Sequence, residues 1–236
     1  MKFQVILCSL CLLLACEKNS NETMIISPST TSSTFTYLAL GDSYTIGESV
    51  SQKDSFPFQL VSQLNQKKAN AMGNPKVIAR TGWTTSELQA AIQAEQGLAK
   101  SYSIVTLLIG VNNQYRGQSA VEYRKDFKAL LQTALSFAGG DKRKVFVVSI
   151  PDWGVTPFGK NSGRLQENIA KEIDLFNSIN IEETLAMNIS YTDITPDSRL
   201  AASDLSLVAG DGLHPSAKMY QGWANALLPK VEAAIN

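Results

Sequence analysis

From residue 35 onward, short β-rich runs alternate with longer segments in which apolar positions recur at helical spacing. This alternation is typical of a parallel sheet whose strands are joined by crossover helices. Two of the runs, 103–110 and 144–150, are nearly continuous in apolar residues, which indicates central strands covered on both faces. The predicted strands are 35–41, 76–81, 103–110, 144–150 and 189–195.

Helices are expected in the segments between these strands. Capping boxes mark two helix starts, Thr84 with Glu87 and Ser119 with Glu122. A final helix should follow Pro215. The segment between the third and fourth strands carries one apolar stripe, which should face the sheet. That stripe consists of Tyr123, Phe127, Leu130, Leu131 and Ala134.

The loops that leave the carboxyl ends of parallel strands gather at one edge of a sheet, where ligands bind. After the first strand stands "GDSY", in which Ser43 is either a turn residue or a nucleophile. Asp42 beside it could be catalytic, but an aspartate at a turn more often accepts hydrogen bonds from nearby backbone N–H groups. The other strand ends read "TGWT", "GVNN", "PDW" and the long segment 196–214.

The single histidine stands in "GDGLHPS", residues 210–216. The spacing of three between Asp211 and His214 can bring the carboxylate to one imidazole nitrogen while the other points away. The alternative is a helix start in which His214 and Pro215 are ordinary surface residues. An imidazole, with an ordinary pKa of about 6.5, is suited to removing the proton of a serine near neutral pH. Ser43 would lie at the same sheet edge.

Four motifs in order, "GDSY", "TGW", "GVNN" and "DGLH", resemble those of the SGNH hydrolases, also called the GDSL esterase/lipase family. The resemblance spans 40–215. It implies a three-layer, flavodoxin-like α/β fold with a five-stranded, mostly parallel sheet and helices on both faces. It also implies hydrolysis of carboxylic esters without a metal or cofactor.

The resemblance assigns roles to five residues. Ser43 would be the nucleophile, and Asp211 and His214 would complete the catalytic group. The backbone N–H groups of Ser43 and Gly82 and the side-chain amide of Asn112 would form the oxyanion hole. Glycine lets the backbone approach a ligand closely.

Two positions depart from the family pattern. Tyr44 replaces the leucine of the first motif, which leaves the chemistry intact. Asn113 replaces the aspartate that usually follows the motif asparagine, so loop anchoring or substrate contacts should differ.

The predicted function is a serine esterase that forms an acyl-enzyme, with short acyl groups favoured because the loops "NNQYRGQS" and "PDWGVTPFGKNSGR" are mostly polar. An apolar groove of Phe158, Leu205 and Leu207 beneath these loops would instead favour a lysophospholipase or thioesterase. A non-catalytic binding lipoprotein is a further alternative. Four aromatic residues could line the site or only pack beneath loops: Trp83, Tyr115, Trp153 and Phe158.

The first 15 residues combine a basic start with an apolar run. The run is shorter than the roughly 20 residues of a spanning helix, so an export signal is predicted. "LLAC" resembles a bacterial lipobox, which implies lipidation at Cys16 and a membrane-anchored protein of the cell envelope. An ordinary secretory signal is the alternative. Residues 16–34 are polar and Ser/Thr-rich, typical of a flexible tether, and the hydrolase domain is predicted at 35–236.

Composition narrows the function further. A chain of 236 residues with 44% hydrophobic residues fits one domain, and 21 basic residues balance 21 acidic ones. The chain therefore has no strong net electrostatic field that would attract nucleic acid. One histidine excludes a multi-histidine metal site, and all three cysteines lie at or before Cys16, so the exported domain should contain no disulfide. The expected partners are an ester substrate, carried by a small molecule, glycan or lipid, and a membrane reached through the anchor.

Overall fold

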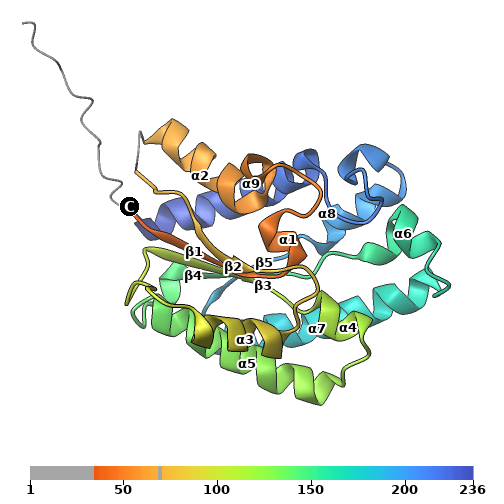
Figure 1. The fold of residues 1–236 in the computed structure, drawn as a ribbon, viewed down its shortest axis with the longest axis horizontal. Helices are drawn as coiled ribbons and strands as arrows, with labels where there is room; N and C mark the ends of the chain where they lie inside the picture. The colour runs from red at the N-terminus through yellow and green to blue at the C-terminus, as the bar shows by residue number, and fades with distance from the viewer. Residues whose placement is uncertain (1–34, 69–70, 236) are drawn as a thin grey trace, which may run out of the picture. The chain divides into compact units, whose positions relative to one another are not determined.

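The computed structural model describes residues 35–68 and 71–235. The predicted signal peptide (1–15), the lipidation site Cys16 and the tether (16–34) lie outside the described residues. Figure 1 shows a central sheet with helices on both sides. No helix within the described residues has the length and apolar character needed to span a membrane.

The sheet has five parallel strands in the order β2-β1-β3-β4-β5. Each observed strand lies inside a predicted run, so the predicted α/β fold with a five-stranded parallel sheet is confirmed. The strands are β1 (Tyr37–Gly41), β2 (Lys76–Ala79), β3 (Ile104–Leu108), β4 (Val145–Val148) and β5 (Ser190–Thr192).

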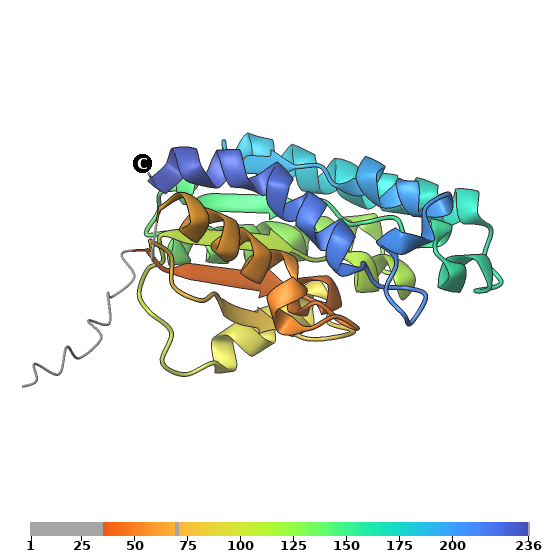
Figure 2. The ribbon, with the colours of Figure 1, turned by 90° about the horizontal axis from the view of Figure 1, so that it is seen from above.

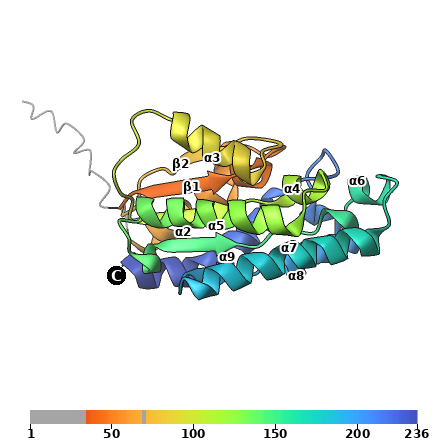
Figure 3. The same cartoon turned by 90° about the horizontal axis from the view of Figure 1, so that it is seen from below.

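Helices cover both faces of the sheet, which explains why every residue of β1, β3 and β4 is buried. On one face lie α2 (Phe56–Lys67) and α9 (Ala217–Ile235), which pack against each other (Figure 2). On the other lie α3 (Thr85–Ala94), α5 (Ala120–Phe137) and α7 (Gln166–Ala186) (Figure 3). The predicted stripe of α5 is buried along its whole length.

The two predicted capping boxes differ in the structure. At the start of α3, Thr84 and Glu87 form the full reciprocal box. At the start of α5, the Ser119 hydroxyl accepts from the Glu122 N–H, but the Glu122 carboxylate accepts from that same hydroxyl instead of from the backbone. Both side chains still fix the first turn of their helix.

The strand order places a topological switch point between β1 and β3. From β1 the chain passes to β2 on one side, and from β3 it passes to β4 on the other. A crevice opens at the carboxyl ends of two such strands. Short helices begin there: α1 (Ser43–Ile46) after β1 and α4 (Val111–Tyr115) after β3.

Candidate active site

Ser43 is the first residue of α1 and is 5% exposed. Asp42 caps this helix, because its Oδ1 accepts a hydrogen bond of 3.0 Å from the Tyr44 N–H. The expected structural role of Asp42 is therefore confirmed. A Cβ at Gly41 would lie 2.4 Å from the Leu108 carbonyl oxygen of β3, so only glycine fits at the end of β1. The sequence Gly-Asp-Ser thus forms a strand end and helix cap that also presents Ser43 at the switch point.

Asp42 is completely buried, and among residues 35–68 and 71–235 its Oδ2 finds no hydrogen-bond partner. Burial raises the pKa of Asp42 to about 7, although the hydrogen bond from the Tyr44 N–H acts in the opposite direction. This carboxyl beside Ser43 therefore changes charge near neutral pH.

Asp211 and His214 are in direct contact. Asp211 Oδ2 lies 2.6 Å from His214 Nδ1, and Asp211 Oδ1 accepts from the backbone N–H groups of Leu213 and His214. The turn that these bonds close holds the carboxylate against the ring. Because Asp211 occupies Nδ1, Nε2 is the nitrogen that remains for the pocket.

Ser49 also contacts this pair, and the sequence offered no signal for it. Its hydroxyl donates a hydrogen bond of 2.7 Å to Asp211 Oδ2. Ser49 has a φ of 65°, a left-handed backbone that serine seldom adopts. Partial burial acts to raise the pKa of Asp211, but the hydrogen bonds from Ser49 and His214 outweigh it and hold the pKa well below its usual value. Asp211 is therefore a carboxylate at neutral pH.

His214 and Ser43 line the same pocket. His214 is 8% exposed, and the Tyr44 ring packs edge-on against it with centroids 5.6 Å apart. Within the described residues, no direct hydrogen bond joins the Ser43 and His214 side chains. Catalytic hydrogen bonds are often long without a bound substrate, so this arrangement is compatible with proton transfer.

Gly82, in the loop after β2, and Asn112, in α4 after β3, border the pocket. Gly82 has a φ of 85°, which glycine adopts without strain, and its carbonyl accepts from Arg116 Nη2 at 2.5 Å. Asn112 Nδ2 donates to the Trp83 carbonyl oxygen at 2.9 Å, which fixes the orientation of the amide. Because an amide nitrogen carries two hydrogens, a second N–H remains for a ligand.

Asn113, the departure from the family pattern, is fully buried and anchors α4 to the start of α3. Its Oδ1 accepts from the Thr85 N–H at 3.1 Å, and its Nδ2 donates to Thr85 Oγ1 and to Gln118 Oε1. An ionised aspartate could not donate these two bonds. The substitution therefore concerns loop anchoring, and Asn113 does not line the pocket.

The pocket has a volume of about 220 Å³ and mostly apolar walls. Three of the aromatic residues left unassigned by the sequence line it, and Trp83 does not. Phe158 lines the pocket, whereas Leu205 and Leu207 do not, so the alternative groove of these three residues is not part of this pocket. The residues that line the pocket are Ser43, Tyr44, Thr81, Gly82, Val111, Asn112, Tyr115, Trp153, Phe158, Leu213 and His214.

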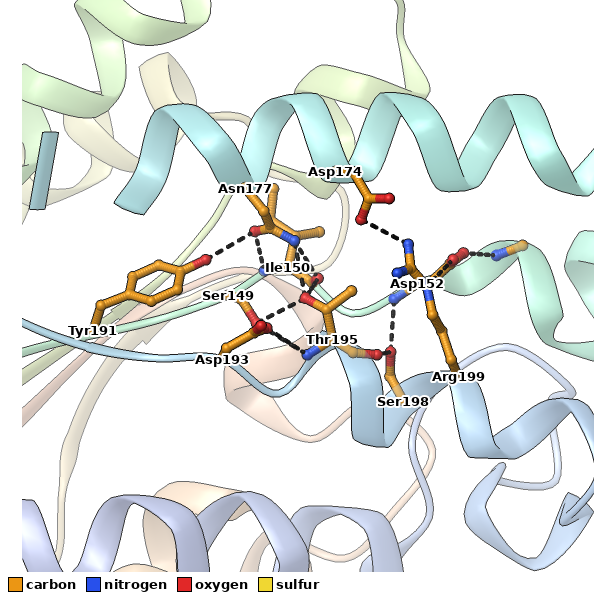
Figure 4. Close-up of polar contacts among 11 residues, drawn as sticks. Ser149, Ile150, Asp152, Asp174, Asn177, Tyr191, Asp193, Thr195, Ser198 and Arg199 are labelled. Atoms are coloured by element: carbon orange, nitrogen blue, oxygen red, sulfur yellow. Dashed lines mark hydrogen bonds and ion pairs between the residues drawn. The ribbon is translucent and has the colours of Figure 1, made fainter. Parts of the chain in front are cut away.

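A polar network fixes the loop that carries Trp153 (Figure 4). Asp152 Oδ1 accepts from the Gly154 N–H at 2.9 Å, and its Oδ2 pairs with Arg199 Nε of α8 (Thr195–Arg199) at 2.9 Å. The Asp152 N–H donates to Ser198 Oγ. Ile150, which precedes Pro151, is held by the Asn177 side chain of α7. The Ile150 N–H donates to Asn177 Oδ1, and the Ile150 carbonyl oxygen accepts from Asn177 Nδ2.

Comparison with known proteins gives a family and a fold. Residues 39–221 match the model of the GDSL-like Lipase/Acylhydrolase family. No curated protein sequence matched the chain. Solved structures with the same fold include LAE5, an α/β hydrolase enzyme from the metagenome of Lake Arreo, Spain, at a TM-score of 0.66 and 16% identity, covering 87% of this chain and 98% of that one.

Two further structures have similar coverage. The lipase/acylhydrolase from Enterococcus faecalis has a TM-score of 0.66 and 16% identity, covering 84% of this chain and 96% of that one. Axe2, an acetylxylan esterase from Geobacillus stearothermophilus, has a TM-score of 0.64 and 18% identity, covering 85% and 95%. At identities this low, these structures show only that the fold is shared. The family model, in contrast, matches most of the chain and shows the family. This protein belongs to the GDSL-like lipase/acylhydrolase family and is a carboxylic ester hydrolase.

Proposed function

We propose that this protein hydrolyses esters of short acyl groups, with Ser43 as nucleophile and His214 as general base. One observation carries the proposal: Asp211 holds the ring of His214 at 2.6 Å, on the wall of a pocket that Ser43 also lines. A carboxylate at Nδ1 fixes the tautomer that leaves Nε2 able to accept a proton.

In the proposed reaction, Ser43 Oγ attacks the ester carbonyl carbon and its proton passes to His214 Nε2. The tetrahedral intermediate then expels the alcohol, which takes that proton, and an acyl-enzyme on Ser43 remains. Water attacks the acyl-enzyme with His214 again accepting a proton, and that proton returns to Ser43 Oγ as the bond between the acyl group and Ser43 breaks and the free acid leaves. Asp211 stabilises the imidazolium at both stages. These steps use side chains and water, and they call for no metal or cofactor.

The oxyanion needs donors that are in place before the reaction. As the first residue of α1, Ser43 has an N–H without an intrahelical partner. The Gly82 N–H and the second N–H of Asn112 complete the proposed hole. The fixed positions of Gly82 and Asn112, described above, support this assignment.

Pocket size supports a short acyl group. A volume of about 220 Å³ is below the roughly 300–1,000 Å³ of pockets that enclose drug-sized ligands. The apolar walls suit the methyl or propyl group of an acetyl or butyryl ester. An O-acetyl group on a glycan is one such ester, and the fold neighbour Axe2 is named an acetylxylan esterase.

A hydrolysis profile across p-nitrophenyl esters tests the proposal. We expect kcat/KM to peak at acetate or butyrate and to fall for longer chains. A preference for decanoate would favour the lysophospholipase or thioesterase alternative. Absence of hydrolysis, together with no labelling by a fluorophosphonate probe, would favour a non-catalytic binding protein.

We further propose that a lipid on Cys16 anchors this enzyme in the cell envelope. The proposal rests on the apolar run and the "LLAC" sequence. Cys16→Ser should release the protein from the membrane fraction or stall its processing, and unchanged membrane association would contradict lipidation at this site.

A further inference from the structure

One wall of the active-site pocket is a pair of aromatic rings, Tyr115 and Trp153. Their centroids lie 5.4 Å apart, edge to face, and Phe158 continues the row at 6.0 Å from Trp153. Tyr115 is 52% exposed, whereas Trp153 is 2% exposed and forms the deep part of the wall.

A closed ring of contacts holds the indole of Trp153. Trp153 Nε1 donates to Gln114 Oε1 at 2.9 Å, and Gln114 Nε2 donates to Glu172 Oε2 at 2.6 Å. The same Glu172 oxygen pairs with Arg164 Nη2 at 2.6 Å, and the Arg164 guanidinium lies 5.6 Å from the centroid of the Trp153 ring. The indole is therefore fixed at its edge by a hydrogen bond and on its face by a cation.

The backbone of Trp153 is fixed as well. Asp152 is tied to α8 by Arg199 and Ser198 (Figure 4). On the other side, a Cβ at Gly159 would lie 2.3 Å from the Trp153 carbonyl oxygen, so the following helix, α6 (Pro157–Lys160), packs directly on this loop. Neither the backbone nor the ring can withdraw from the pocket without breaking these contacts.

A second hollow, of about 510 Å³, adjoins this wall. Tyr115 borders both hollows, whereas Gln114, Arg164 and Glu172 border only the second. Tyr115 and Trp153, together with the side chains that hold the indole, therefore lie between the pocket and the second hollow. Arg164 and Glu172 keep about a third or more of their side chains exposed, so their ion pair contributes little to overall stability.

We propose that Trp153 sets the upper limit on acyl length by closing the pocket toward the second hollow, and that Gln114, Glu172 and Arg164 are positioning residues that hold it. This inference rests on the proposed function of the pocket as an acyl site. A longer chain would have to displace a ring held by two polar contacts. Without the indole, the chain could extend into the second hollow, and each additional buried methylene would raise kcat/KM by up to about fourfold.

The test compares kcat/KM for p-nitrophenyl acetate and octanoate in the full chain and its variants. Trp153→Ala should raise the octanoate-to-acetate ratio at least about tenfold, and Trp153→Phe should raise it less. Arg164→Ala should raise the ratio severalfold while Trp153 itself is intact. Arg124→Ala is the matched control: Arg124 also pairs with glutamates of α7, Glu182 and Glu183, but does not touch Trp153, so the ratio should stay within twofold.

Far-UV circular dichroism and fluorophosphonate labelling show whether each variant is folded and active. An unchanged ratio in labelled Trp153→Ala would overturn this inference and leave the esterase proposal intact. If Trp153→Ala does not fold, the ratio in Arg164→Ala decides: a rise supports the inference, and no rise overturns it. A wild-type protein that neither hydrolyses esters nor takes the label would overturn both proposals.

Discussion

The Ser49 hydroxyl donates a hydrogen bond of 2.7 Å to Asp211 Oδ2, the same oxygen that lies 2.6 Å from His214 Nδ1. Two groups therefore hold one carboxylate oxygen, and one of them comes from a loop 162 residues earlier in the chain. The left-handed backbone of Ser49 aims its side chain at this oxygen. Surroundings that maintain such a backbone commonly occur at functional sites.

Loss of the Ser49 hydroxyl should weaken catalysis without weakening binding. Ser49→Gly keeps the left-handed backbone and removes only the side chain, so we expect kcat to fall about tenfold with KM little changed. The pKa of Asp211 should move up toward its usual value, because the hydrogen bond from Ser49 helps to hold it down.

Ser51→Ala is the control for this variant. The Ser51 hydroxyl, in the same loop, bonds Asp54 and does not reach Asp211. Its kinetics should match the wild type. A Ser49→Gly enzyme with unchanged kcat would show that Asp211 is oriented by His214 and the backbone alone.

The buried Asp42 should make stability depend on pH. Its pKa is raised to about 7, against about 3.9 for an aspartate in an unfolded chain. Between these values the folded chain keeps a proton that the unfolded chain has released, so the free energy of unfolding falls as pH rises and levels off above about 7. Asp211 acts in the opposite sense, because its stabilisation is present above its unfolded pKa and is lost as pH falls below about 4.

Urea unfolding from pH 5 to pH 8 measures the effect of Asp42. Asp42→Asn has no proton to lose and can still accept from the Tyr44 N–H, so it should remove a fall of about 3 kcal/mol across this range. Asp197→Asn, at an exposed carboxylate, should keep the wild-type slope. A slope that persists in Asp42→Asn would place the buried proton elsewhere.

Asn112→Ala should lower kcat by about 10² to 10³ with little change in KM, because the amide would bond charge that develops only in the transition state. Steady-state kinetics with p-nitrophenyl acetate measures this. An effect confined to KM would reassign Asn112 to substrate binding. Asn161→Ala, at an exposed amide directly after α6, serves as the control.

The fold could be predicted because apolar runs mark the buried strands. Burial also explains why some predicted strands extend beyond the observed ones. Ile109, Ile150 and Ile194 lie in predicted strands and are buried, but they follow the last residue of β3, β4 and β5. The core therefore extends past the hydrogen-bonded ladder. The bounds of α7 could not be predicted, because polar residues such as Asn177 and Asn180 occupy its buried face and interrupt the apolar pattern.

Local spacing indicated the contact between Asp211 and His214, since only three residues separate them. Contacts that join distant segments had no such signal. Ser49 is one serine among many in the sequence, and only the packing of its loop against the turn at 209–214 brings it to Asp211. Trp153 similarly gains its place in the pocket wall from Gln114 and Arg164, which come from separate segments of the chain.

The most direct measurement of the central claim is the reaction of Ser43. Wild type should hydrolyse p-nitrophenyl acetate and take one fluorophosphonate label on the peptide that contains Ser43. Ser43→Ala should lose the label and more than about 10⁴-fold in kcat while keeping the wild-type circular dichroism spectrum. Ser86→Ala, at an exposed serine of α3, should behave as wild type. Hydrolysis or labelling that persists in Ser43→Ala would contradict the assignment of Ser43 as the nucleophile.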